Sequence, residues 1–210
     1  MKIKHRIRMI VMETLTPFKK ISGNHKIKQG LKNNKTVKIV IGASDVYEKG
    51  WIPTDVSNLN LLRKEDWSRY FDNYPIDLAL AEHVWEHLTK EEAEIAAKNV
   101  YSFLKVGGNL RVAVPDGYHQ SSEYVDKVRV GGTGPGSYDH KVLYNYKTFK
   151  KVFEKAGFKT ELLEYFDENK KFHQSEYSDN FGIINRSMNN DLRNHKKPLS
   201  YTSIILDATK

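Results

Sequence analysis

The chain has 210 residues, of which 39% are hydrophobic and 29% charged, a composition that predicts one folded α/β domain and excludes a disordered chain. The absence of cysteine excludes disulfides and thiolate metal sites. The net charge is +8. The apolar stretch Met9–Met12 is too short for a secretory signal core, and no stretch could span a bilayer, so we expect a cytoplasmic protein.

The positive charge is concentrated at the N-terminus. Residues 1–36 contain ten Lys or Arg and one acid, Glu13, which gives +9, whereas residues 37–210 are close to neutral at −1. Apolar residues recur at helical spacing near the start, and they are Ile3, Ile7, Ile10 and Val11. We therefore predict a basic helical leader over 1–36. Its helix either packs on the core or lies on a membrane surface or an acidic partner through residues 1–20. No basic motif interleaved with aromatic residues follows, so no nucleic-acid partner is expected.

Strands are predicted where short β-rich runs meet glycine, proline or acidic residues. The run VKIVIG is the most typical of a buried strand, and the run near Leu59–Leu62 is the weakest. The expected strands are 37–42, 51–55, 59–62, 76–81, 110–114, 158–166 and 200–208.

Helices are predicted between several of these strands, at 67–71, after Thr89 and at 146–156. Thr89 and Glu92 form a capping-box pattern, and we expect Gly107–Gly108 to stop that helix. Because this helix lies between two strands, the order predicts a parallel crossover unit. Residues 37–210 are thus expected to form an α/β sandwich around a mostly parallel sheet.

Two segments are not expected to join this framework. Residues 130–137, VGGTGPGS, predict a hinged loop that could close over an acceptor molecule. The polar residues 167–198 predict an irregular insertion.

The ends of the predicted strands are the expected ligand site, because open α/β sheets bind ligands at the carboxyl edge. Gly42 would let backbone approach a ligand, and Asp55 could accept hydrogen bonds from ribose hydroxyls. Asp55 follows Gly42 by only 13 residues, and G-x-G-x-x-G is absent. A dinucleotide-binding dehydrogenase is therefore disfavoured. Asp55 could instead simply cap a turn.

Three segments resemble those of class I S-adenosylmethionine (SAM)-dependent methyltransferases, in particular a small predicted-methyltransferase group related to the type 11 family. VIGASDVYEKGWIPTD is similar to that group's glycine loop and G-W-I-N-x-D. IDLALAEHVWEHLTKEEA is similar to its E-H-x-x-E-H-L segment, and YSFLKVGGNLRVAVPDG to its L-K-P-G-G-x-L-R-I-A-V-P-D strand. The resemblance covers roughly residues 37–118, with weaker similarity in AGF and YTSIILDA. It implies the Rossmann-like class I fold, a mostly parallel seven-stranded sheet with an antiparallel last strand.

The resemblance also implies a set of SAM-binding residues. Asp55 would hold the ribose hydroxyls and Val56 would touch the adenine. The methionine portion would face Gly42, Ala43 and Ser44, with Glu82 and His83 at its end. The adenine-contacting loop would fall on Glu65, Asp66 and Trp67.

The chain departs from the family pattern at two places in the glycine loop. The usual G-x-G is Gly42-Ala43-Ser44, and the acid or Asn that often stands two residues before the glycine is Val40. These departures remove one anchor for the amino group of SAM.

The expected activity is methyl transfer from SAM to an oxygen of a small molecule or glycan. His83 and His140 are the candidate bases, because imidazole transfers protons near neutral pH. Asp116 and Tyr138 are candidate substrate-binding residues, although Asp116 could equally cap a turn, and His140 could be a simple loop histidine. The alternative is an inactive methyltransferase-like module that binds a membrane surface or an acidic partner through its leader.

No metal site is expected. Glu86 and His87 follow His83 closely, but the segment reads as a bend between strand and helix, and no acid-rich loop accompanies it. His87 is therefore predicted to be structural.

Overall fold

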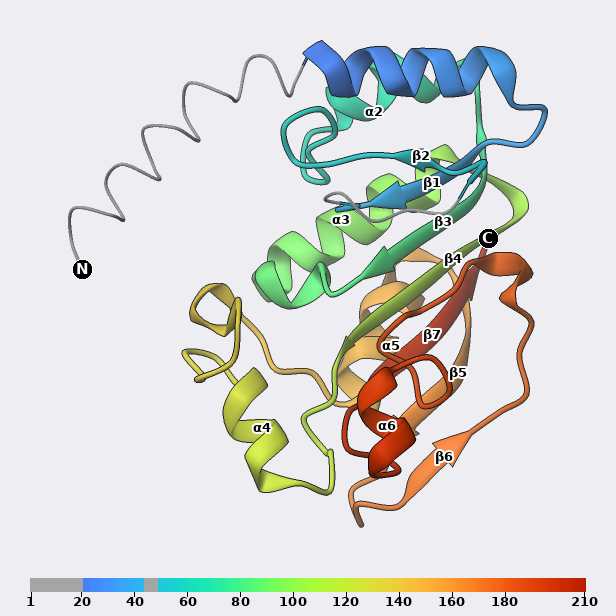
Figure 1. The fold of residues 1–210 in the computed structure, drawn as a ribbon. Coiled ribbons are helices and arrows are strands. Elements are labelled where there is room, and N and C mark those ends of the chain that lie inside the picture. The colour runs from blue at the N-terminus through green and yellow to red at the C-terminus, as the bar shows by residue number, and fades with distance from the viewer. Residues whose placement is uncertain (1–20, 44–48) are drawn as a thin grey trace.

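A computed structural model describes residues 21–43 and 49–210 (Figure 1). The predicted helix at Ile3–Val11 and the site candidate Ser44 lie outside these residues. Residues 21–33 are helical, and this helix buries Ile27 and Leu31 in the main hydrophobic core. The described part of the leader is therefore packed on the domain.

Seven strands form one sheet in the order β2-β1-β3-β4-β7-β5-β6 (Figure 1). Their bounds are β1 (Lys38–Ile41), β2 (Ile52–Pro53), β3 (Ile76–Glu82), β4 (Leu104–Pro115), β5 (Lys159–Phe166), β6 (Phe172–Gln174) and β7 (Ser203–Thr209). Neighbouring strands from β2 to β4 are parallel, and β7 runs antiparallel to both β4 and β5. This is the Rossmann-like sheet of the class I methyltransferase fold, so the predicted fold class is confirmed.

One predicted strand is wrong, and another strand takes its place in the count. Leu59–Leu62 is a loop, because the carbonyl oxygen of Leu61 accepts Trp67 Nε1 at 3.3 Å and Asn99 Nδ2 at 2.7 Å. Side chains thus occupy the acceptor that a strand partner would need. The seventh strand is β6, which lies within the predicted insertion and pairs with β5.

The crossover unit from β3 to β4 forms as predicted, with both strands parallel. Helix α3 (Lys90–Phe103) begins with the predicted capping box: Thr89 Oγ1 accepts from the Glu92 amide, and Glu92 Oε2 accepts from the Thr89 amide. The helix ends before Gly107–Gly108, which lie inside β4. Its end is therefore set by the extended backbone of Leu104, and not by the two glycines.

The remaining helices are α2 (Lys64–Phe71), α4 (Ser122–Val128), α5 (Tyr146–Ala156) and α6 (Leu192–Lys196), with 3-10 turns η1 (Trp85–His87), η2 (Ser137–Asp139) and η3 (Asp179–Phe181). Helix α5 ends at Gly157 in the left-handed conformation, as predicted. Helix α4 was not predicted. Ser121 caps its N-terminus by accepting from the Tyr124 amide.

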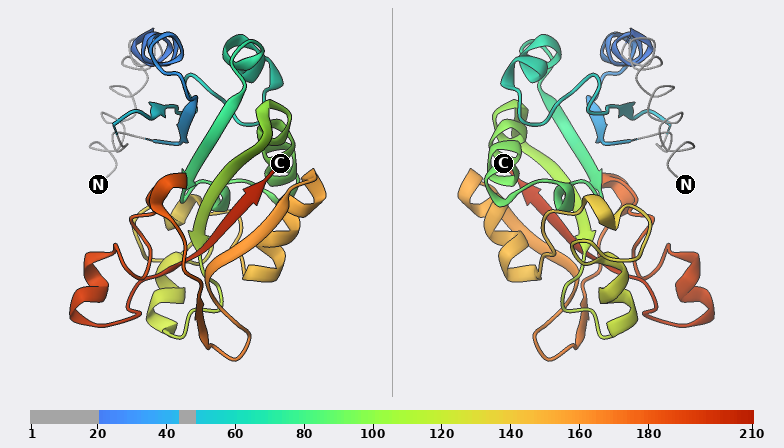
Figure 2. Two further views of the ribbon diagram at one scale, coloured as in Figure 1. Left: turned by 90° about the vertical axis from the view of Figure 1, so that its right-hand side faces the viewer. Right: turned by 90° about the vertical axis from the view of Figure 1, so that its left-hand side faces the viewer.

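Two apolar layers enclose the sheet. The larger contains residues of α2, α3 and α5, and the smaller contains Val40, Leu80, Ile184 and Ile205. Figure 2 shows α3 and α5 on one side of the sheet and α6 on the other. Because Ile184 is 1% exposed, the segment predicted as an insertion supplies core to the second face.

A buried ion pair joins this second layer to the sheet. Arg111 on β4 donates two hydrogen bonds of 2.8 Å to the carboxylate of Asp207, its register partner on β7. Its remaining terminal nitrogen donates to the carbonyl oxygens of Ser178 and Gly182, both at 2.8 Å. One fully buried guanidinium therefore joins two strands and the segment around η3.

We expect Arg111→Met to lower the free energy of unfolding by about 3–5 kcal/mol, because it leaves the Asp207 charge buried without its partner. Chemical denaturation measures the change. Arg129→Met is the control: Arg129 forms an exposed pair with Asp126, so its loss should change stability by less than about 1 kcal/mol. Equal stability of the two variants would contradict the assignment, and Arg111→Met with Asp207→Leu should recover most of the loss.

Candidate functional site

A cavity of about 430 Å³ opens at the carboxyl ends of β1, β2 and β3. Its walls come from four segments, which are the glycine turn after β1, the loop after β2, the turn after β3 with η1, and η2. The lining residues are Ile41, Gly42, Asp55, Val56, Leu59, Asn60, Leu61, Leu62, His83, Val84, His87, Leu88 and Asp139. This volume is typical of pockets for small ligands.

Gly42 forms the floor of the cavity because a side chain cannot fit there. Its φ is +65°, and a Cβ atom would lie 2.7 Å from Cγ2 of Val84. The turn after β1 therefore packs directly against the turn after β3. The adjacent Ala43 is buried in the smaller core layer and does not line the cavity.

Asp55 also lines the cavity, just after β2. The turn that carries it is closed by its own backbone, since the Asp55 carbonyl accepts the amides of Asn58 and Leu59, and its amide donates to Asn58 Oδ1. Within residues 21–43 and 49–210, no group donates a hydrogen bond to the Asp55 carboxylate. This carboxylate is thus available to a ligand, and the 71% exposed Val56 stands beside it.

The residues predicted from the adenine-contacting loop lie behind the wall instead. Trp67 is fully buried and holds Leu61, while Asp66 accepts the Asn60 amide at 3.1 Å. Glu65 is exposed on α2. None of the three lines the cavity, and the apolar wall consists of Leu59, Leu61 and Leu62. Sequence reasoning missed these leucines because it assigned them to a strand.

The side chains of the strand-end residues Glu82 and His83 lie in different places. The Glu82 carboxylate accepts the amides of Asn185 and Arg186, and their side chains as well, so it faces the second layer. His83 lines the cavity with a φ of +56°. Its Nε2 lies 3.0 Å from Ser203 Oγ, and its Nδ1 lies 3.2 Å from Oε1 of Glu86. Both ring nitrogens of this candidate base are therefore engaged.

The structure brings Glu86, His87 and His140 together beside the cavity, with one ligand atom of each within 4.8 Å of the others. The backbone explains the approach: the Glu86 carbonyl accepts the amides of Lys141 and Val142, which ties the segment after η2 to η1. Burial tends to raise the pKa of Glu86, but the charges of His83 and His87 lower it below its usual value.

The two candidate substrate residues do not line this cavity. Asp116 is fully buried and accepts the amides of Tyr118 and Phe166, so it holds the turn after β4. Burial raises the pKa of Asp116 to about 6, although these two amides act against it. Tyr138 is 85% exposed on η2, next to the cavity-lining Asp139.

The glycine-rich segment 130–137 is folded against helix α4. The amide of Gly132 donates to the Arg129 carbonyl and that of Gly134 to the Lys127 carbonyl. A Cβ atom on either glycine would lie 2.7 Å from a backbone oxygen of α4. These glycines therefore serve a close approach to the helix end.

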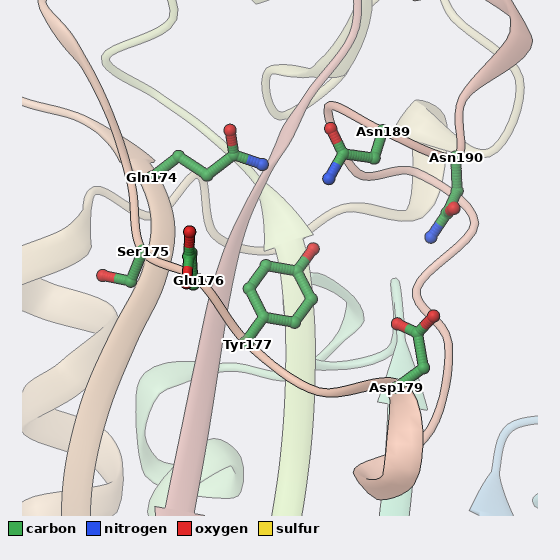
Figure 3. A pocket seen from close by; sticks show the side chains of 7 residues that line it. All are labelled: Gln174, Ser175, Glu176, Tyr177, Asp179, Asn189 and Asn190. Atoms are coloured by element: carbon green, nitrogen blue, oxygen red, sulfur yellow. The ribbon is translucent and has the colours of Figure 1, made fainter.

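A second cavity, of about 510 Å³, lies in the second layer and is lined by polar residues (Figure 3). Figure 3 shows the amides of Gln174 and Asn189 extending toward each other across it. Tyr177 and Gln174 donate to the buried Glu164, and burial raises the pKa of that carboxyl. This cavity is built on β6 and the segment around η3, away from the glycine turn.

No family model matches the chain, and no curated protein matches it. Solved structures show a distant likeness. A SAM-dependent methyltransferase from Archaeoglobus fulgidus is 16% identical, with 97% of this chain and 99% of that one covered and a TM-score of 0.46. One from Thermotoga maritima is 12% identical, with 99% and 96% covered and a TM-score of 0.48.

PigF with S-adenosylhomocysteine (SAH) is 10% identical, with a TM-score of 0.46. The likeness covers 77% of this chain and only 36% of the PigF chain. At TM-scores below 0.5, these likenesses identify neither a reaction nor an acceptor for this protein.

Replacing Gly42 tests the contact that forms the cavity floor. We expect Gly42→Ala to destabilise the protein more than Gly107→Ala. Both glycines have positive φ, which a side chain disfavours by about 1–2 kcal/mol, but only at Gly42 would the new methyl meet a neighbour. Urea denaturation gives both values. Val84→Ala should couple favourably with Gly42→Ala in a double-mutant cycle, and additive effects would refute the close contact.

Proposed function

We propose that the protein is a SAM-dependent methyltransferase that transfers a methyl group to an oxygen of a small molecule or glycan. The observation that carries the proposal is the cavity between Gly42 and Asp55, at the carboxyl edge of a class I methyltransferase sheet. A carboxylate without a protein donor fits ribose hydroxyls, and a floor without a side chain fits a closely approaching ligand. The residues present therefore fit an adenosyl group.

SAM supplies an already activated methyl group, so the protein has mainly to align the acceptor and exclude water. The leucines of the loop after β2 provide an apolar wall, and Val56 is placed to cover a flat base. A cytoplasmic location and a membrane contact through residues 1–20 are part of the proposal on the basis of composition alone. Among the described residues, no helix combines the length and apolar character needed to cross a bilayer.

An inactive SAM-binding module is the second candidate, and the glycine loop favours it. Val40 is buried among apolar residues of the smaller core layer, so it offers the amino group of SAM no anchor. SAM binding without turnover on a broad panel of hydroxyl and carboxyl acceptors would favour this module. Turnover of any acceptor on that panel would exclude it.

We expect Asp55→Ala to weaken SAM binding by about 2 kcal/mol, or roughly 30-fold, because hydrogen bonds to a charged group contribute about 1.5–3 kcal/mol. Isothermal titration with SAM and SAH measures the change. Asp72→Ala removes an exposed carboxylate just after α2 and should leave the affinity unchanged. If the wild-type protein binds neither compound at millimolar concentration, the proposed function is wrong.

A further inference from the structure

A buried carboxylate next to the cavity lacks the partners that buried charges require. Glu86 is 1% exposed, and neither of its side-chain oxygens has a hydrogen bond among the described residues. The ring of His83 lies 3.2 Å from Oε1 of Glu86, but off the direction of a hydrogen bond. A buried carboxylate whose oxygens lack hydrogen bonds is costly, and coordination of a metal ion is one of the few arrangements that compensate it.

Two histidines supply the other ligands of such a site. His87 follows Glu86 on η1, and its Nδ1 is buried without a hydrogen bond, 3.4 Å from an oxygen of Asp139. His140 Nδ1 bonds the Val128 carbonyl at 2.7 Å. Because a carbonyl only accepts, that nitrogen carries the proton, and Nε2 is left with a free lone pair. A histidine whose second nitrogen donates to a carbonyl is the usual metal-binding arrangement.

We propose that Glu86, His87 and His140 bind a divalent transition-metal ion at the edge of the cavity. Two imidazoles and a carboxylate suit Zn²⁺ and its first-row neighbours, and they do not suit Mg²⁺ or Ca²⁺, which prefer oxygen ligands. Ligand atoms around a tetrahedral ion with bonds of about 2.1 Å lie roughly 3.4 Å apart. The ligand atoms that the three residues offer lie within 4.8 Å of one another, so they need to close by up to about 1.4 Å.

The site borders the proposed cofactor cavity, because His87 and Asp139 line it. Three protein ligands leave a coordination position open. If the proposed function holds, an acceptor hydroxyl bound there would lose its proton to solvent more readily, and its oxygen would then take the methyl group. Metal binding itself requires neither SAM nor an acceptor.

The test is a metal titration of the full chain without an affinity tag, after removal of metal with a chelator. Competition with a chromophoric chelator should show one equivalent of tightly bound Zn²⁺. Co²⁺ should give the visible absorption of a four-coordinate centre. Zn²⁺ should also raise the melting temperature, because it binds the folded state. Failure to bind Zn²⁺, or binding of Mg²⁺ as tight as that of Zn²⁺, would overturn the proposal.

Variants locate the ion. Glu86→Gln and His87→Ala should each weaken Zn²⁺ binding at least tenfold and abolish the rise in melting temperature. Glu86→Gln keeps the size and shape of the side chain, so the metal-free variant should still fold, and its circular dichroism spectrum should match that of the metal-free wild type. His195→Ala, an exposed histidine on α6, is the matched control and should bind as the wild type does. Wild-type affinity in both cluster variants would place any bound ion elsewhere and overturn the proposal.

Titration of SAM on the same metal-free protein separates the two proposals. SAM binding without Zn²⁺ binding leaves the proposed function standing and removes the metal site. Zn²⁺ binding without SAM binding leaves the metal site standing and removes the proposed function.

Discussion

The approach of Gly42 to Val84 is the constraint on which the site depends. Strands β1 and β3 are parallel neighbours, so their carboxyl ends lie side by side. The turns that follow them come so close that a Cβ atom at Gly42 would lie 2.7 Å from Cγ2 of Val84. The missing side chain at Gly42 lets the two turns touch and leaves the room above them to a ligand. The turn after β3, which carries Val84, leads directly into η1 and so to Glu86 and His87.

The sequence predicted those parts of the fold that are governed by local interactions. The capping box at Thr89, the glycine end of α5 and the crossover from β3 to β4 depend on residues close together in the chain, and all three are present. The loop at Leu59–Leu62 was mistaken because its backbone acceptor is occupied by Trp67 and by Asn99, a residue on α3 far along the chain. No local pattern carries that information.

Only some of the residues around the cavity were predicted from the sequence. Gly42, Asp55 and His83 were identified from their places at strand ends and Val56 from the family resemblance, and all four line the cavity. The group formed by Glu86, His87 and His140 was not predicted, because it depends on two amide hydrogen bonds that join η1 to a distant segment. The sequence shows that Glu86 and His87 are adjacent, but a metal site also needs His140, and only the folded chain brings that residue close to them.

The hydroxyl of Ser203 has a consequence for proton positions in the cavity. It donates to the carbonyl of Arg186 at 2.8 Å, and a carbonyl has no proton to give back. His83 Nε2 therefore faces the lone pairs of the Ser203 hydroxyl, and it must carry a hydrogen to bond them. The hydrogen on Nε2 of a cavity histidine is therefore dictated by the main chain of a neighbouring layer.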